Sequence, residues 1–182
     1  ISSLDIIRGL IMKLIFSIAA LILIPAISLA EAPVTDGPLG FVLWNSELIQ
    51  TTADRLEKEL GDKHMVYQTI GNYEGHSMYL VLRGKTGTSE VHETESDFYI
   101  SMRGHATFLI GGELTEAEMR PRKQQRGKSV SGGKSHPIGP GDILHVPVAV
   151  PHQIVIGPDE PYMYILIKLD EEPITPKRAS AL

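Results

Sequence analysis

Cysteine is absent from this chain of 182 residues, and its absence excludes several kinds of protein. Without cysteine there is no disulfide framework, no thiolate metal site, no cysteine nucleophile and no lipidated N-terminal cysteine. An exported protein of this kind must be stabilised by its hydrophobic core, with help from a metal ion or a partner chain. The length is sufficient for one domain with such a core.

An excess of positive charge is also lacking. Lys and Arg number 17 against 22 Asp and Glu, which gives a net charge of -5 at pH 7. A chain with this balance has no general attraction to phosphate groups, so we predict that it has no nucleic acid partner. The hydrophobic share of 42% and the charged share of 21% indicate an ordinary soluble globular domain.

Several sequence motifs of well-known enzyme classes are missing. The chain contains no Walker loop, no dinucleotide-binding fingerprint, no Gly-x-Ser-x-Gly elbow and no His-Glu-x-x-His helix. Nothing in it indicates a serine or cysteine nucleophile. Any catalysis must therefore depend on other groups.

Residues 12–30 are predicted to be a secretory signal peptide. A positive charge at Lys13 precedes a largely apolar run over 14–24, and the small residues Ser28 and Ala30 suit cleavage after Ala30. The alternative is an uncleaved anchor, but the apolar run is shorter than the roughly 20 residues that a spanning helix needs. We therefore expect a periplasmic or secreted protein with no stable membrane span after cleavage.

The segments around the predicted domain have simple interpretations. Residues 1–11 lie upstream of a start at Met12 and are predicted to be an extension with no structural role. Residues 31–45 contain prolines and glycines and are predicted to be an irregular lead-in, and residues 171–182 a tail. The folded domain is expected over the part that remains.

One amphipathic helix is predicted over residues 46–61. Ser46 is a suitable N-cap and Gly61 a suitable stop. Apolar residues recur at helical spacing, with charged residues on the other side. We expect this helix to lie against the outside of a sheet. The apolar positions are Ile49, Ala53, Leu56 and Leu60.

Residues 62–170 are predicted to form a sandwich or closed barrel of short strands. The segments are rich in β-branched and aromatic residues and are separated by glycine turns. Many short strands at close spacing favour an all-β fold over alternating βαβ units. The expected strands are 65–70, 76–82, 97–102, 105–110, 142–146, 153–156 and 162–168.

A long segment over residues 113–134 interrupts this pattern and is predicted to be a loop. It is rich in arginine, lysine and glycine. One interpretation is a solvated surface excursion. The other is a rim or lid whose cations attract an anionic substrate toward the mouth of the barrel.

Two motifs about fifty residues apart resemble those of the cupin superfamily. The first runs from Gly84 to Gly104 and contains Glu-Val-His at 90–92 and an aspartate at 97. The second runs from Gly141 to His152 through a Pro-Val-Ala segment. The resemblance covers about residues 78–169 and implies a single jelly-roll barrel.

The cupin resemblance implies four metal ligands. On a strand, residues two apart share a face, so Glu90 and His92 project together. Asp97 is five residues after His92, so a turn or bulge between them must reset the alternation. His152 comes from a distant strand. The resemblance thus implies one divalent ion, Fe, Mn, Ni or Zn, held by Glu90, His92, Asp97 and His152.

The chain departs from the usual cupin pattern at several positions. Cupins usually have histidine at the position of Glu90, glutamate at that of Asp97 and glycine at that of Ala149. Glu90 keeps the capacity to ligate and favours harder ions such as Mn or Fe. Ala149 is expected to affect packing only. A further prediction concerns Tyr99, which shares the inward face with Asp97 and is a candidate proton-transfer or barrel-filling residue.

What the resemblance implies about activity is broad. Oxygenase, isomerase and lyase chemistry all occur on cupin barrels, so the first hypothesis is a metal-dependent enzyme acting on a small, anionic molecule. The alternative is a non-catalytic exported module that binds a sugar or a small acid. Cupins often exchange edge strands, which implies a homodimer. The remaining histidines are expected not to be ligands, and these are His64, His76, His105, His136 and His145.

Overall fold

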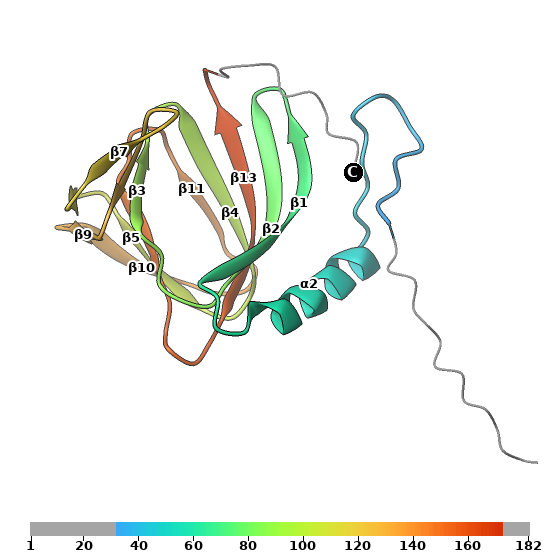
Figure 1. Ribbon diagram of the computed structural model, residues 1–182, viewed down its shortest axis with the longest axis horizontal. Coiled ribbons are helices and arrows are strands. Elements are labelled where there is room, and N and C mark those ends of the chain that lie inside the picture. The colour runs from blue at the N-terminus through green and yellow to red at the C-terminus, as the bar shows by residue number, and fades with distance from the viewer. Residues whose placement is uncertain (1–31, 173–182) are drawn as a thin grey trace, which may run out of the picture.

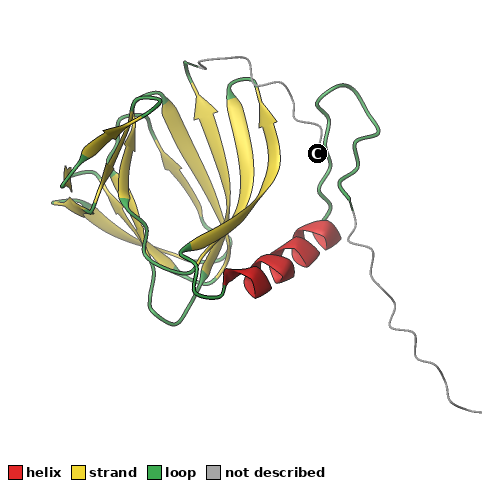
Figure 2. Ribbon diagram, viewed as in Figure 1, coloured by secondary structure: helices red, strands yellow, loops and turns green. Residues whose placement is uncertain are grey.

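The computed structural model describes residues 32–172, in which the strands curve into a barrel with one helix outside it (Figures 1 and 2). The extension at 1–11, the signal peptide at 12–30 and the tail beyond residue 172 lie outside the described residues, so those predictions stay predictions. Within the described part, no helix has the length and apolar character needed to cross a bilayer.

Two antiparallel sheets form the barrel. The first has the strand order β1-β2-β13-β4-β11, and its strands are β1 (Met65–Tyr73), β2 (His76–Arg83), β13 (Tyr162–Asp170), β4 (Glu95–Arg103) and β11 (Ile143–Val146). The second has the order β10-β5-β12-β3-β8-β7, and its strands are β10 (Lys134–Ile138), β5 (Ala106–Ile110), β12 (His152–Val155), β3 (Ser89–His92), β8 (Gln124–Gly127) and β7 (Glu118–Arg120).

The order of strands in both sheets departs from their order in the chain, as a jelly roll requires. In the first sheet β4 pairs with β13 and β11, and in the second β12 lies between β5 and β3. The predicted all-β jelly-roll barrel with one N-terminal helix is therefore confirmed.

The helix, α2 (Ser46–Leu60), begins at the predicted residue, but its cap differs. Asn45, not Ser46, is the N-cap, because its side-chain Oδ1 accepts a hydrogen bond of 2.8 Å from the backbone N–H of Leu48. Both residue types cap well, so the sequence alone does not choose between neighbours. The predicted stop at Gly61 is confirmed, and its φ of 45° suits glycine.

Two hydrophobic clusters lie on the two faces of the first sheet. The outer cluster joins α2 to this sheet through Ala53, Leu56, Leu80, Leu82 and Met163, so the helix covers the outside of the barrel as predicted. The strand β2 contributes to both clusters because its successive residues point to opposite faces. The inner cluster fills the barrel between the sheets with Val81, Tyr99, Phe108, Ile154, Tyr162 and Tyr164.

The prediction of a loop over residues 113–134 is wrong. This segment contains β6 (Glu113–Thr115), β7, β8 and β9 (Ser129–Ser131) and leads directly into β10. Two of its strands extend the second sheet, and β6 pairs with β9. Its polar composition concealed the strands, because these short hairpins have one face in water and little apolar alternation.

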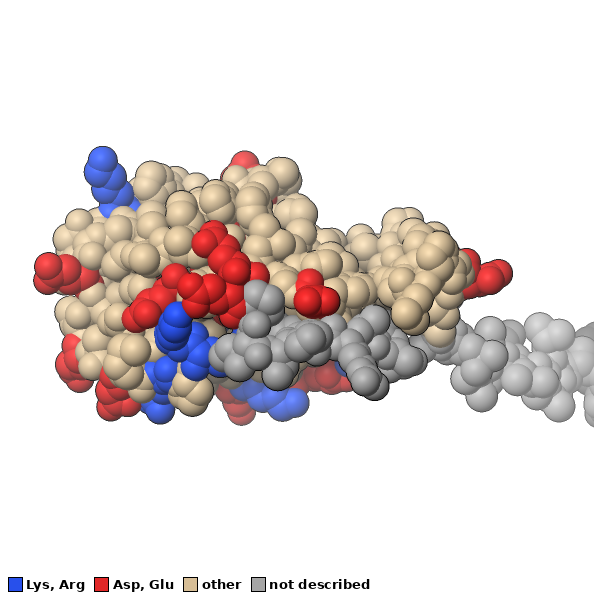
Figure 3. All heavy atoms as spheres, turned by 90° about the horizontal axis from the view of Figure 1, so that it is seen from above, with Lys and Arg blue, Asp and Glu red and all other residues tan. Residues whose placement is uncertain are grey.

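Most cations of this segment are neutralised by acids. Arg122 is ion-paired with Asp170 at 2.6 Å, and Lys123 is ion-paired with Glu172 at 2.6 Å. On the face shown in Figure 3, acidic and basic side chains accordingly lie next to one another. The segment thus does not form a uniformly cationic rim.

Tyrosines in the inner cluster make the stability of the barrel sensitive to alkaline pH. Burial raises the pKa of Tyr162 to about 12, compared with 10 for an ordinary tyrosine. As the pH rises, the unfolded chain loses this proton before the folded chain does. The contribution of Tyr162 to stability is therefore fully present below pH 10 and is lost between about pH 10 and 12.

Between pH 8 and pH 11, we predict that the free energy of unfolding falls by about 1 kcal/mol less in Tyr162→Phe than in the wild type. The variant has no phenol to titrate at this position, and pH 11 lies one unit above the pKa of 10 in the unfolded chain, where one unit is worth about 1.4 kcal/mol. At pH 8 the variant should be less stable, because the Ser101 hydroxyl loses its partner at 2.6 Å. Urea unfolding at both pH values measures this. Tyr67→Phe, at an exposed tyrosine, is the control. Equal losses for Tyr162→Phe and the wild type would contradict the prediction.

Candidate metal centre

The candidate ligands come together at the junction of β3, β12 and β4, inside the barrel. Glu90 and His92 lie two residues apart on β3, and His152 lies directly opposite Glu90 in the antiparallel pairing of β12 with β3. Asp97 lies on β4 in the other sheet. The chain bends at residues 93–94 between β3 and β4, which is the phase reset that the spacing of His92 and Asp97 required.

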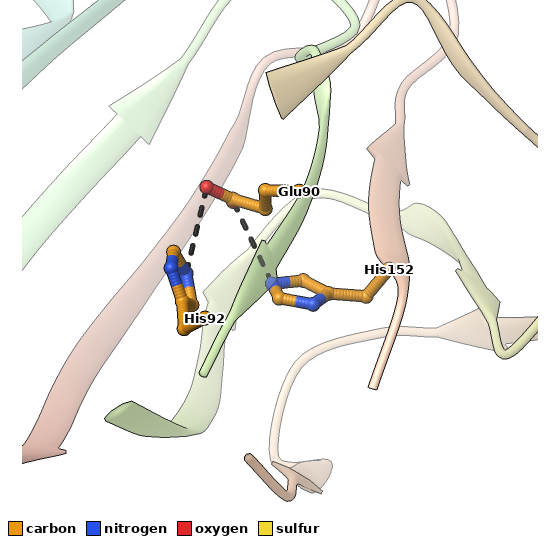
Figure 4. Close-up of side chains that lie close together, drawn as sticks. All are labelled: Glu90, His92 and His152. Atoms are coloured by element: carbon orange, nitrogen blue, oxygen red, sulfur yellow. Dashed lines mark ion pairs between the residues drawn. The ribbon is translucent and has the colours of Figure 1, made fainter. Parts of the chain in front are cut away.

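Three of the four side chains form the tightest group. The ligand atoms of Glu90, His92 and His152 all lie within 4.8 Å of one another (Figure 4). Oε2 of Glu90 lies 3.6 Å from Nε2 of His92, and its Oε1 lies 3.6 Å from Nε2 of His152. Both imidazoles are buried and Glu90 is nearly so. The cluster is therefore an interior site formed by two strands.

Asp97 lies beside this group. Its Oδ2 is 3.4 Å from Nε2 of His92 and 3.7 Å from Nε2 of His152. The same oxygen accepts a hydrogen bond of 3.0 Å from the hydroxyl of Tyr99. The structure thus brings all four predicted ligands together. That Asp97 coordinates the metal ion stays a prediction.

These distances fit a shared cation better than direct hydrogen bonds. Separations of 3.4–3.7 Å between the candidate ligand atoms are long for hydrogen bonds. Two atoms that each lie about 2.1 Å from a tetrahedral ion are roughly 3.4 Å apart. A divalent ion therefore fits the carboxylate–imidazole distances of this donor set.

The protonation of His152 also suits a metal ligand. Its Nδ1 lies 3.0 Å from the carbonyl oxygen of Val150, which only accepts, so Nδ1 carries the hydrogen. In the neutral ring Nε2 then has the lone pair, and this buried atom has no hydrogen-bond partner among residues 32–172. Such an orphaned acceptor is costly unless something binds it. The ring is thus held in the tautomer that coordinates a metal.

The backbone of the second motif fixes this geometry. Ala149 has a φ of 59°, and its N–H donates a hydrogen bond of 2.7 Å to the carbonyl oxygen of His92. Glycine adopts such a conformation more easily than alanine does. The backbone of Ala149 thus joins the bend that precedes His152 to β3, and the expectation that its side chain affects packing only stays a prediction.

Lys168 is a residue of the site that the sequence did not indicate. It lies on β13 opposite Asp97 in the register, and its Nζ is 2.6 Å from Oδ1 of Asp97. The same atom is 3.2 Å from Nε2 of His92. The available signal was a lysine directly after the apolar and aromatic run 162–167 of β13. The ammonium group of Lys168 thus lies next to Nε2 of His92, where it would compete with a metal ion for the lone pair of that nitrogen.

The electrostatics of Asp97 follow from these neighbours. Burial by itself would raise the pKa of its carboxyl group, but the imidazoles of His152 and His92 and the ammonium of Lys168 hold that pKa well below its usual value. Asp97 is therefore an anion that compensates the positive charge of the site.

A pocket, which we call the inner pocket, reaches this cluster through Glu90 and Asp97. Its cavity volume is about 260 Å³. The wall combines polar groups from both sheets with tyrosines and aliphatic side chains, namely Met65, Tyr67, Tyr79, Val81, Arg83, Glu90, Asp97, Tyr99, Arg126, Tyr164, Leu166 and Lys168.

The comparisons with known proteins agree with the fold and say little more. No protein-family model and no curated protein matches the chain. Among solved structures it is similar to a cupin 2 conserved barrel domain protein from Salinispora arenicola, with 18% identity, a TM-score of 0.39, and 58% of this chain and 76% of that chain covered.

Two further solved structures have similar values. KdgF from Halomonas sp. has 18% identity and a TM-score of 0.41, with 60% of this chain and 82% of that chain covered. The polyketide cyclase RemF from Streptomyces resistomycificus has 16% identity and a TM-score of 0.43, with 66% and 73% covered. The cupin resemblance is confirmed at the level of the fold by the strand arrangement described above, and these TM-scores support no argument about activity.

We predict that His152→Ala or His92→Ala lowers the affinity for Mn or Zn by more than about 100-fold, because each change removes a ligand rather than an outer partner of one. We expect Lys168→Met to raise the affinity, because it removes a cation that competes for the lone pair of His92. Isothermal titration of the metal-depleted protein measures both effects.

His145→Ala is the matched control for these titrations, because His145 is exposed and stacks on Phe98 away from the cluster. Its affinity should equal that of the wild type. Unchanged affinity in His152→Ala, or a loss of affinity in Lys168→Met, would contradict the assignment of the centre.

Proposed function

We propose that this chain is a metal-dependent enzyme that catalyses proton transfer on a small anionic molecule, in a reaction of the isomerase or lyase type. The observation that carries the proposal is the meeting of Glu90, His92 and His152 beside a pocket of about 260 Å³. That volume is just under the roughly 300–1,000 Å³ of typical ligand sites, so the substrate is small.

The metal ion has a defined part in this proposal. Glu90, His92 and His152 would hold one divalent ion, which is Fe, Mn, Ni or Zn, with Asp97 as an additional ligand or an adjacent anion. When bound, such an ion polarises an oxygen of the substrate and stabilises negative charge that develops there. The protein supplies the dry interior in which this interaction is strong.

Lys168 is the candidate proton carrier. Its side chain lines the inner pocket and is mostly buried, and its ammonium is held between Asp97 and His92. An ammonium group so positioned has protons available on the side of the pocket. This arrangement favours acid–base chemistry.

Tyr99 is better suited to positioning than to proton transfer. Burial, together with the negative charge of Asp97, raises the pKa of Tyr99 well above its usual value. Its proton is also engaged in the hydrogen bond to Asp97. Tyr99 therefore orients that carboxylate, and its catalytic role stays a prediction.

The cellular setting rests on the sequence alone. We propose that the protein is exported and acts in the periplasm or outside the cell, because residues 12–30 have the pattern of a signal peptide. We also propose a homodimer, in keeping with the cupin resemblance. Fractionation of expressing cells and light scattering of the purified protein test these two statements.

We predict that metal-loaded protein exchanges or eliminates protons from at least one member of a panel of hydroxy and keto acids, observed by NMR in deuterated water. His152→Ala should abolish both metal binding and turnover. Lys168→Met should retain the metal and lower turnover by about 10²–10⁴-fold, the usual contribution of a positioned acid or base.

Two results would redirect this proposal. Consumption of dioxygen together with substrate would replace proton transfer by oxygenase chemistry. A ligand that raises the melting temperature without any turnover would identify a binding module instead of an enzyme. His145→Ala is again the control, since it leaves the interior unchanged.

A further inference from the structure

The inner pocket contains more positive than negative charge. Three cations line it, Arg83, Arg126 and Lys168, against two carboxylates, Glu90 and Asp97. One positive charge is left over, and a divalent metal ion would increase the surplus to three. An interior with such a surplus favours an anion.

Two of the three cations already have carboxylate partners. Arg126 on β8 lies opposite Glu90 in the register and is ion-paired with it. Lys168 is ion-paired with Asp97. Each of these pairs is neutral by itself and lies within one sheet, so the surplus charge belongs to the remaining cation.

Arg83 is that remaining cation. It is half-buried at the end of β2, and among residues 32–172 no carboxylate lies within ion-pair distance of its guanidinium. Its neighbours include the hydroxyl of Tyr164, which neutralises no charge, and Arg126, which repels it. The Nε–H of Arg83 is buried without an acceptor. A carboxylate bonded to Nε and a terminal nitrogen together would satisfy this donor.

The guanidinium is also held in one place. Its Nη1 lies directly over Gly87, where an added Cβ would be 2.5 Å away. The backbone of Gly87 is itself fixed, because its N–H donates to Ile154 and its carbonyl accepts from the side chain of Gln153. A pre-positioned cation of this kind binds an anion with little loss of side-chain freedom.

The rest of the pocket wall is apolar and aromatic. Tyr67 and Tyr79 form an edge-to-face pair with ring centroids 5.9 Å apart, and Val81 and Leu166 complete the wall. Tyr67 is 57% exposed and Met65 is 39% exposed, although both are large apolar side chains of this pocket. A flat apolar ring would cover these surfaces.

We propose that Arg83 binds the carboxylate of a small aromatic acid whose ring lies against Tyr67 and Tyr79 in the inner pocket. The inference deepens the proposed function, on which it rests for the metal centre at the other side of the pocket. It names the substrate class as aromatic carboxylates and Arg83 as the residue that selects their charge.

The test uses benzoate, phenylacetate and, as an uncharged analogue, phenol. We expect benzoate or phenylacetate to bind the purified protein in isothermal titration, and Arg83→Met to weaken that binding by more than about tenfold, because a charge-assisted bidentate contact is lost. Phenol should bind wild type and Arg83→Met equally weakly. Arg83→Lys should restore part of the affinity, since a lysine keeps the charge without the planar fork.

A second variant tests whether the position of the Arg83 guanidinium matters as well as its charge. Gly87→Ala keeps the arginine but displaces its tip, so we expect an intermediate loss of benzoate affinity. Arg120→Met is the control, because Arg120 is exposed and, among residues 32–172, is ion-paired only with Glu118. Circular dichroism confirms that each variant is folded.

The outcomes distinguish this inference from the proposed function. Metal binding without any Arg83-dependent carboxylate binding would overturn the inference and leave the metal centre intact. Arg83-dependent benzoate binding in a protein that takes up no metal would support the inference while the proposed function fails. Tighter binding of inorganic phosphate than of benzoate, or no binding of either aromatic acid at millimolar concentration, would overturn the substrate class.

Discussion

Two carboxylates, two imidazoles and a lysine share one small interior, and the need to compensate their charges governs the structure around them. A buried ion without a partner is strongly destabilising, so each group must be paired, hydrogen-bonded or bound to a cation. Asp97 meets this requirement through Tyr99 and Lys168, and Glu90 through Arg126. His152 meets it only in part, because its Nε2 has no hydrogen-bond partner.

The fold supplies these partners from strands far apart in the sequence. The pairing of β12 with β3 places His152 opposite Glu90, and the pairing of β13 with β4 places Lys168 opposite Asp97. The two hydrophobic clusters, one inside the barrel and one beneath α2, hold the strands in this register. A slip of one residue in either pair would turn the polar side chains out of the interior, so packing and the site depend on each other.

The three cations of the inner pocket, two arginines and one lysine, differ in whether they have a carboxylate partner. Arg126 and Lys168 have carboxylate partners inside the barrel and balance the acids of the candidate metal centre. Arg83 has none among the described residues, its buried Nε–H has no acceptor there, and it lines the same pocket as the tyrosines and aliphatic side chains. A structure that only needed to bury its acids would not require this third cation. The pocket is therefore asymmetric, with a candidate metal centre and a separate cation on a common apolar wall.

Much of this molecule follows from local sequence. The short runs of apolar and aromatic residues in strands such as 76–82, the amphipathic run after Ser46 and the two motif spacings predicted the barrel, the helix and the four converging side chains. These signals act over only a few positions of the chain. Tertiary structure decided the rest. The strands within 113–134 lack an apolar pattern and form by pairing with neighbours, and Lys168, Arg126 and Arg83 enter the pocket through registers between distant strands. Those registers depend on the packing of the whole barrel, which no short window of sequence contains.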